Sequence, residues 1–144
     1  MIKSIEMDMP KSLEKKEITI NSSVENLVFV EREIEAIFDE FNISFDLFGN
    51  VLIAVTEAVN NAIQYGNRND VTKQVLIRFQ AKGQRLSVVI ADEGQGFDYE
   101  SLPDPTAPEN LEKMEGRGIF LMKSLSDGLS FYNNGSEVEM TFKF

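Results

Sequence analysis

Apolar residues recur at alternating steps of three and four over residues 27–41, which is the period of an amphipathic helix. The stripe consists of Leu27, Val30, Ile34, Ile37 and Phe41. Ser22 stands three residues before Glu25, the spacing of a capping box that closes the start of a helix. Residues 42–44 break the pattern, so we expect this helix to end there.

A second amphipathic pattern starts near Ser44 and predicts a helix that ends at Gly66-Asn67. Its apolar face consists of Phe45, Phe48, Leu52, Val55, Val59 and Ala62. A glycine that ends a helix often takes the left-handed conformation, which residues with a β-carbon adopt at a cost. We therefore expect Gly66 to stop this helix in that conformation.

Apolar residues at every second position predict strands in most of the remaining chain. The alternation is clear everywhere except in the first of these strands, where it is weak. Residues 82–84 predict the turn of one hairpin, and Asn134-Gly135 the turn of another. The predicted strands cover residues 16–20, 75–79, 86–90, 129–132 and 138–144.

Residues 98–115 fit neither period and hold three of the four prolines of the chain, which predicts a mobile lid. A helix is expected after it, over residues 117–127. The order of elements predicts an α+β two-layer sandwich, with helices packed on one face of a mixed, mostly antiparallel sheet. We expect residues 1–144 to form a single domain.

Composition narrows the classes of function. The chain has 14 basic and 24 acidic residues, a net charge of −10, which argues against direct binding of nucleic acid. It has no His and no Cys, so neither imidazole nor thiol chemistry is available. No apolar run approaches the roughly 18 residues of a membrane span, and the first ten residues do not resemble a signal peptide. A cytoplasmic location is therefore expected.

The first candidate motif is Glu-Ala-Val-Asn-Asn-Ala at residues 57–62, within the second predicted helix. Glu57 and Asn61 are four residues apart and share one helix face, which Asn60 flanks. A carboxylate can accept a proton from an attacking hydroxyl, and an amide oxygen is a suitable ligand for Mg²⁺. The alternative interpretation is a solvated polar face of a helix.

The second motif is Asp-Glu-Gly-Gln-Gly-Phe at residues 92–97, directly after a predicted strand. Asp92 can accept a hydrogen bond from an exocyclic amine such as that of adenine. Gly94 and Gly96 lack a β-carbon and allow the backbone to approach a flat ring. A simple tight turn would use the same residues.

The third motif is Gly116-Arg117-Gly118, which is expected to precede a helix. Backbone amides at the start of a helix form an anion site, because they are unpaired and lie at the positive end of the helix dipole. The spacing is that of neither a Walker A loop nor a dinucleotide fingerprint. A glycine hinge between lid and helix is the alternative interpretation.

The three motifs in this order resemble the GHKL family of ATPases and kinases, which share an α/β sandwich that binds ATP. Within it, the short chain is similar to the anti-sigma-factor serine/threonine-protein kinases of bacterial partner switching, from about Ile18 to Phe144. The resemblance implies ATP and Mg²⁺ as cofactors. It also implies a STAS-type anti-sigma-factor antagonist as substrate, a sequestered sigma factor as possible partner, and a possible homodimer.

The resemblance also implies roles for individual residues. Glu57 would be the catalytic base and Asn61 the Mg²⁺ ligand. Asp92 would bind adenine, with Gly94 and Gly96 beside it, and Asn60 and Arg117 would also contact the nucleotide. Gly116 and Gly118 would close over the phosphates. Gly135-Ser136 resembles a Gly-Thr pair of the family, in which the hydroxyl supports the adenine-binding aspartate.

Two positions depart from the family pattern. Tyr65 stands where a histidine is usual, at a position that is mostly structural. Met114 stands where these kinases commonly carry an arginine near the γ-phosphate, with Lys113 and Arg117 as possible substitutes. ATP binding is therefore better supported than phosphoryl transfer. A nucleotide-dependent protein-binding switch without kinase activity, and a globular domain without nucleotide, stay open as alternatives.

Overall fold

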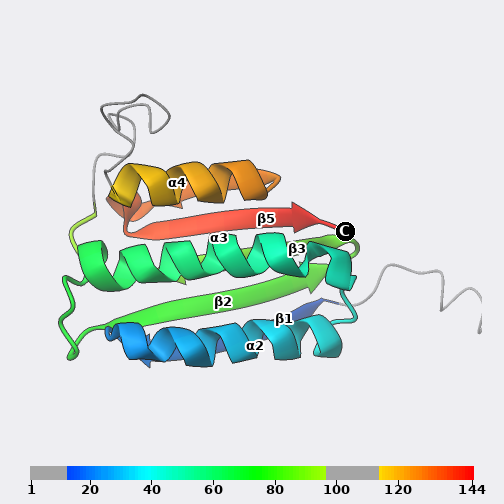
Figure 1. Ribbon diagram of the computed structural model, residues 1–144, viewed down its shortest axis with the longest axis horizontal. Helices are drawn as coiled ribbons and strands as arrows, with labels where there is room; N and C mark the ends of the chain where they lie inside the picture. Colours follow the sequence, from blue (N-terminus) through cyan, green and yellow to red (C-terminus); the bar gives the residue numbers. More distant parts are fainter. Residues whose placement is uncertain (1–12, 97–113) are drawn as a thin grey trace, which may run out of the picture.

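The computed structural model describes residues 13–96 and 114–144, and the side chains of the second range from Arg117 onward. Three helices lie side by side on one face of a five-stranded sheet (Figure 1). The strands are β1 (Glu14–Asn21), β2 (Gln74–Lys82), β3 (Arg85–Ala91), β4 (Gly128–Tyr132) and β5 (Glu137–Lys143). The main helices are α2 (Leu27–Glu40), α3 (Phe48–Asn61) and α4 (Met114–Leu125).

The sheet has the strand order β1-β2-β3-β5-β4, and every pairing among the described strands is antiparallel. Lys82 pairs with Arg85, so the β2–β3 hairpin closes over two residues, Gly83 and Gln84, with Gly83 at a φ of +63°. Both predicted hairpins and the opening strand are present. The predicted two-layer α+β architecture is confirmed.

The core lies between the helices and the sheet. The apolar stripes of α2 and α3 and the alternate residues of the strands point into this single layer, as period 3.6 and period 2 require. Residues with no exposed surface include Ile34, Ile37, Val55, Val59, Ile77, Phe79, Val88, Met140 and Phe142. The helices therefore cover one face of the sheet.

The start of α2 differs from the prediction, because there is no capping box. A short 3-10 helix (Val24–Asn26) precedes α2, and its first-turn amides receive no side-chain bond from the residue before it. The Ser22 hydroxyl instead donates to the carbonyl of Lys73 at 2.8 Å, and Ser22 is 1% exposed. Because the Ser22 hydroxyl is buried and bonded to the residue before β2, it does not cap the helix.

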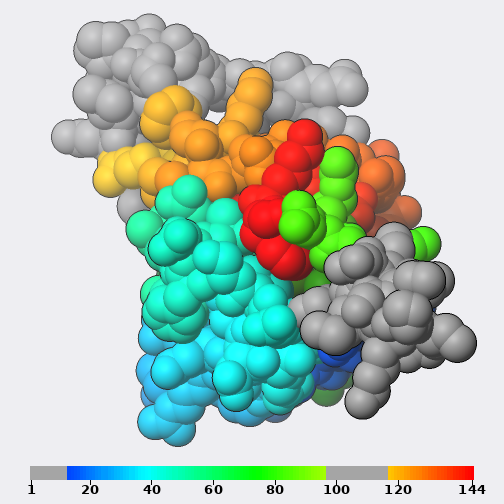
Figure 2. All heavy atoms as spheres, turned by 90° about the vertical axis from the view of Figure 1, so that its right-hand side faces the viewer, coloured from blue at the N-terminus to red at the C-terminus, as the bar shows by residue number. Residues whose placement is uncertain are grey.

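The start of α3 also differs. Residues Phe45–Leu47 form a 3-10 helix, in which each residue turns by about 120° rather than about 100°. Phe45 therefore leaves the predicted apolar face: it is 62% exposed and stacks on Phe48 at 4.5 Å between ring centres. This end of the molecule, which Figure 2 shows with the start of α3 in cyan, lies opposite the candidate site described below.

The end of α3 is prolonged by a π-helical turn (Ala62–Gly66). The helix ends at Gly66 as predicted. Gly66 itself does not take the left-handed conformation, and the positive φ values occur after it, at Arg68 (+53°) and Asn69 (+59°). A side chain at Gly66 would instead collide with the carboxylate of Asp92.

The predicted lid lies mostly outside the described residues, which resume at Met114 as the first residue of α4. The helix therefore starts three residues earlier than predicted. Within the described part of the chain, no helix is long and apolar enough to cross a membrane.

Candidate functional site

A cavity of about 230 Å³ opens at the end of the sheet where β3 ends and β5 begins. The end of α3 and one face of α4 form its other walls, so the four elements converge at the left of Figure 1. Of the residues selected from the sequence, the cavity is lined by Asn61, Asp92, Gly96 and Ser136. The first two motifs, which are more than 30 positions apart, thus meet at one site.

The walls of the cavity are mainly apolar. Ile90 and Val138 come from the sheet, Met122 from α4 and Ala58 from α3, and all four are buried. Ala62, Ile119 and Phe131 also contribute to the apolar lining. Apolar walls with few convergent polar groups are typical of a pocket for a flat organic ring.

Asp92 is the half-buried carboxylate of this cavity. Its backbone amide donates to the carbonyl of Ser136 at 2.9 Å, and its Oδ1 accepts from the amide of Gly94 at 2.8 Å. Among the described residues no other donor contacts the carboxylate, so Oδ2 keeps its capacity to accept a hydrogen bond. A carboxylate fixed through one oxygen and free at the other can recognise an amine in the cavity.

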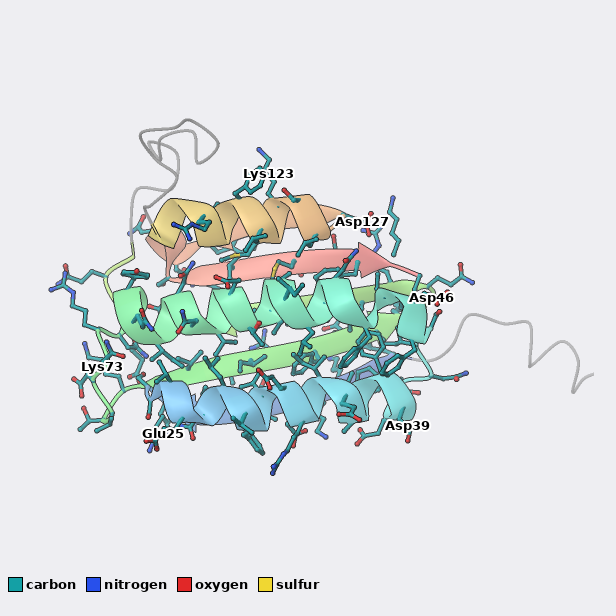
Figure 3. All side chains as sticks on the ribbon, viewed as in Figure 1. Glu25, Asp39, Asp46, Lys73, Lys123 and Asp127 are labelled. Atoms are coloured by element: carbon teal, nitrogen blue, oxygen red, sulfur yellow. The ribbon has the colours of Figure 1, made fainter. Side chains whose placement is uncertain are left out.

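Burial makes the ionised form of Asp92 less favourable than it would be in water. Burial raises the pKa of Asp92 above its usual value, while the Gly94 amide and the positive charge of Lys73 lower it in part. Lys73 lies at the same end of the sheet (Figure 3). Because an unfavourable environment for a charge is typical of functional sites, the direction of this shift supports a binding role for Asp92.

The raised pKa leads to a prediction about stability. The ionised form of Asp92 destabilises the fold above its folded-state pKa, and this cost is lost as the pH falls toward the unfolded value of 3.8. We expect Asp92→Asn, which keeps an acceptor for Gly94, to melt a few degrees above the wild type at pH 7. The difference should shrink in thermal melts as the pH is lowered from 7 toward 3.8, and a variant that melts well below the wild type at pH 7 would contradict this expectation.

Gly66 and Gly94 let the backbone approach Asp92 closely. A β-carbon on Gly66 would overlap the Asp92 carboxylate, and one on Gly94 would overlap the carbonyl oxygen of Gly66. Gly96 has a φ of +83°, and a β-carbon there would overlap the carbonyl of Asn134. The end of α3 and the loop after β3 are thus in close backbone contact. A side chain at Gly66 or Gly94 would displace Asp92.

Glu57 and Asn61 meet beneath α4. A β-carbon on Gly118 would lie 2.8 Å from Nδ2 of Asn61 and 3.3 Å from Oε2 of Glu57. Asn61 lines the cavity, whereas Glu57 lies one helical turn earlier and outside its lining. The predicted shared face of this pair is confirmed, and Gly118 is the residue that lets α4 lie against it.

Asn60 is not part of the cavity lining. Its Oδ1 accepts a hydrogen bond from Nε2 of Gln64 at 3.0 Å, along the surface of the helix. Its predicted contact with the nucleotide stays a prediction.

The third motif lies within α4 and not before it, which corrects the prediction. In a helix that starts at Met114, the amides of the first turn have no acceptor in the helix, and that of Gly116 is among them. The amide of Gly118 falls within reach of the Met114 carbonyl, so it is expected to serve the helix. Gly118 acts instead through its missing side chain.

Ser136 also acts differently from the expectation. Its hydroxyl donates to the carbonyl of Asn133 at 2.9 Å and does not contact Asp92. The support for Asp92 comes from the Ser136 carbonyl, which accepts the Asp92 amide. Ser136 therefore positions the backbone of Asp92.

Several lining residues were not among the site residues selected from the sequence. They are Ala58, Ala62, Tyr65, Gly66, Arg68, Ile90, Ile119, Met122, Phe131, Gly135 and Val138. The helical period marks two of them, since Ala58 precedes Asn61 by three positions and Tyr65 follows it by four. The strand period marks Ile90, two before Asp92. Arg68 and the α4 residues carry no such signal.

Comparison with known proteins places the chain among nucleotide-using domains. Residues 20–142 match the family model of the histidine kinase-like ATPase domain. The chain is 27% identical over 135 residues to the serine-protein kinase RsbW of Staphylococcus epidermidis, covering 89% of this chain and 85% of that protein. It is 28% identical over 133 residues to RsbW of Staphylococcus aureus strain JH9, covering 87% and 84%.

A solved structure gives the same fold. The crystal structure of the RsbU and RsbW domains of Rv1364c from Mycobacterium tuberculosis superposes with a TM-score of 0.64 at 13% identity. The match covers 90% of this chain and 32% of that longer one, so it supports the fold alone. The family resemblance read from the three motifs is confirmed.

Proposed function

The chain belongs to the histidine kinase-like ATPase domain family, and on that premise we propose that it is an ATP-dependent serine/threonine-protein kinase. Its proposed substrate is a STAS-type anti-sigma-factor antagonist, and it also sequesters a sigma factor. The observation that carries the proposal is the free oxygen of Asp92 in an apolar cavity that reaches Asn61, beside Glu57. The relatives named serine-protein kinase support the same class of reaction.

Adenine recognition rests on Asp92. The Oδ2 atom accepts a hydrogen bond from the exocyclic amine of adenine, while Ile90, Met122 and Val138 contact the faces of the ring. Guanine has a carbonyl oxygen at the corresponding position, which the carboxylate repels. The cavity is therefore expected to select ATP over GTP.

Phosphoryl transfer rests on Glu57 as the catalytic base. The serine or threonine oxygen of the antagonist forms a bond to the γ-phosphorus of ATP, the bond from that phosphorus to the β–γ bridging oxygen breaks, and ADP leaves. Glu57 takes the hydroxyl proton. Because such transfer depends on positioning and charge neutralisation, the amide of Gly116 in the first turn of α4 contributes by facing the phosphates.

The residues present fit a magnesium ion that is held mainly by nucleotide. Among the described residues no group of three or more acidic side chains gathers at one point, so a site made only of protein ligands is not available there. Asn61 offers one amide oxygen at the cavity, which suits an ion that keeps phosphates and waters as its other ligands. When bound, Mg²⁺ supplies neutralisation of phosphate charge.

We therefore expect Asn61→Ala to weaken the binding of ATP in the presence of Mg²⁺ by about tenfold, the effect of losing one ligand worth about 1.4 kcal/mol. Without Mg²⁺, the variant and the wild type should bind ATP alike. Isothermal titration with and without EDTA measures both, and an equal loss in the two conditions would remove Asn61 from the metal site.

Further features of the proposal follow from the family. Residues 1–144 would act as one ATP-binding domain, which pairs as a homodimer. A second candidate function, a nucleotide-dependent switch without kinase activity, is favoured by one observation: Glu57 lies outside the cavity lining, under α4. Met114 in place of the usual arginine favours it as well.

The two functions are separated by incubating the protein with γ-labelled ATP and a STAS-type antagonist. We expect label on a serine or threonine of the antagonist, and none when that residue is replaced by alanine. ATP binding without transfer of label would instead support the switch.

A further inference from the structure

Asn67 is a buried polar residue whose side-chain amide makes hydrogen bonds through both its nitrogen and its oxygen. It follows the end of the π-helical turn and is 1% exposed. Its Nδ2 donates to Oγ of Ser22 at 2.8 Å and to the carbonyl of Gln74 at 3.0 Å, and its Oδ1 accepts from the amide of Glu93 at 2.8 Å. Two donors and one acceptor are thus all engaged.

These bonds join three separate elements to the end of α3. Ser22 follows β1, Gln74 begins β2, and Glu93 follows Asp92 at the end of β3. Ser22 links this network to the residue before β2, because its hydroxyl donates to the carbonyl of Lys73 at 2.8 Å. The network therefore has an inner part, from Asn67 to Glu93, and an outer part, from Asn67 to Ser22.

The inner part bears directly on Asp92. The amide of Asp92 is held by Ser136 at 2.9 Å, and the next amide, that of Glu93, is held by Asn67. The Glu93 side chain also accepts from the amide of Gln74, which fixes the same residue a second time. With both flanking amides held, the peptide after Asp92 cannot rotate without breaking a buried hydrogen bond.

We propose that Asn67 is a positioning residue that sets the direction of the Asp92 carboxylate and thereby the preference of the cavity for adenine over guanine. The proposal rests on the proposed ATP-binding function. It assigns the selectivity to the Oδ1 atom of Asn67, which holds Glu93, and not to the Nδ2 atom, which holds β1 and β2 in place.

The test compares three variants by the ratio of the affinities for ATP and GTP, measured by isothermal titration. Both nucleotides carry the same charge, so this ratio is insensitive to general electrostatic repulsion. Asn67→Ala removes both parts of the network, Ser22→Ala removes only the outer part, and Asn67→Asp keeps an acceptor for the Glu93 amide. Melting temperatures of all three provide the measure of stability.

We expect Asn67→Ala to lower the ATP-to-GTP ratio by about tenfold, which corresponds to one misplaced hydrogen bond. Ser22→Ala and Asn67→Asp should keep the ratio within about twofold of the wild type. Both should melt at lower temperature, because Ser22→Ala loses the bond from Asn67 and Asn67→Asp loses both bonds that Nδ2 donates. If Asn67→Ala does not fold, Asn67→Ser takes its place, because its hydroxyl is one bond too short to reach the Glu93 amide. The positioning role predicts the same fall in the ratio for this variant, and an unchanged ratio would overturn it.

A wild-type ratio in folded Asn67→Ala would overturn the proposal, as would a ratio that falls with melting temperature across all three variants. Failure of the proposed function has a different result. A wild type that binds neither nucleotide would refute ATP binding itself, whereas a wild type that prefers ATP keeps the function and leaves only Asn67 in question.

Discussion

Replacing Glu57 by glutamine is expected to lower the rate of phosphoryl transfer by about 10²- to 10⁴-fold, the usual contribution of a general base. Glutamine has the same shape as glutamate, so the packing of α3 against Gly118 is kept. ATP affinity should stay within a few-fold, because Glu57 lies outside the cavity lining and acts on the nucleophile. Single-turnover transfer of labelled phosphate to the antagonist measures the rate.

A matched control removes one negative charge elsewhere. Glu35→Gln on the exposed surface of α2 changes the net charge equally and should leave the rate of transfer unchanged. Wild-type transfer by Glu57→Gln would exclude this residue as the base and would favour the switch without kinase activity.

Gly66→Ala is expected to reduce ATP affinity by at least tenfold, although Gly66 itself carries no functional group. The added β-carbon takes the place of the Asp92 carboxylate, which must move away from the position fixed by Gly94. A misplaced buried hydrogen bond costs about 1–3 kcal/mol, or about one to two powers of ten in affinity. Equilibrium binding of a fluorescent ATP analogue measures the loss.

Gly49→Ala serves as the control for this substitution. Gly49 lies in the first turn of α3 with nothing within 4 Å of an added β-carbon, so alanine there should raise stability by about 0.5–1 kcal/mol and leave binding intact. The double variant Gly66→Ala, Asp92→Ala should recover stability relative to Gly66→Ala but not ATP binding. Unchanged binding in Gly66→Ala would mean that the carboxylate does not need its observed position.

Periodic patterns predicted the elements of this fold because one face of each element is buried. The alternation of Val138, Met140 and Phe142 gives a strand with one buried face, and the stripe of α2 lies against the sheet. The same argument failed at Phe45, where a 3-10 turn changes the period for three residues. It also misplaced the start of α4, because Met114 and Glu115 carry no capping signal and follow a segment rich in proline.

Residues of the candidate site could be selected from the sequence, but the contacts that position them could not. Glu57, Asn61 and Asp92 have side chains whose chemistry can be read from local spacing. The contacts that position them, such as Gly66 against Asp92 and Asn67 against Glu93, join residues about 26 positions apart. Such contacts depend on how the end of α3 packs against the end of β3. The spacing of apolar residues within one helix or strand does not predict that packing.

Isothermal titration of ATP with Mg²⁺ into the wild type and Asp92→Asn determines whether the cavity binds the adenine of ATP through Asp92. The Gly94 amide holds the oxygen of the new side chain, which turns its NH₂ group toward the adenine amine, so two donors face each other. If Asp92 binds the adenine, we expect one site in the wild type, a preference for ATP over GTP, and binding at least about tenfold weaker in the variant. Equal affinity in the two proteins, or GTP bound by the wild type as tightly as ATP, would contradict it.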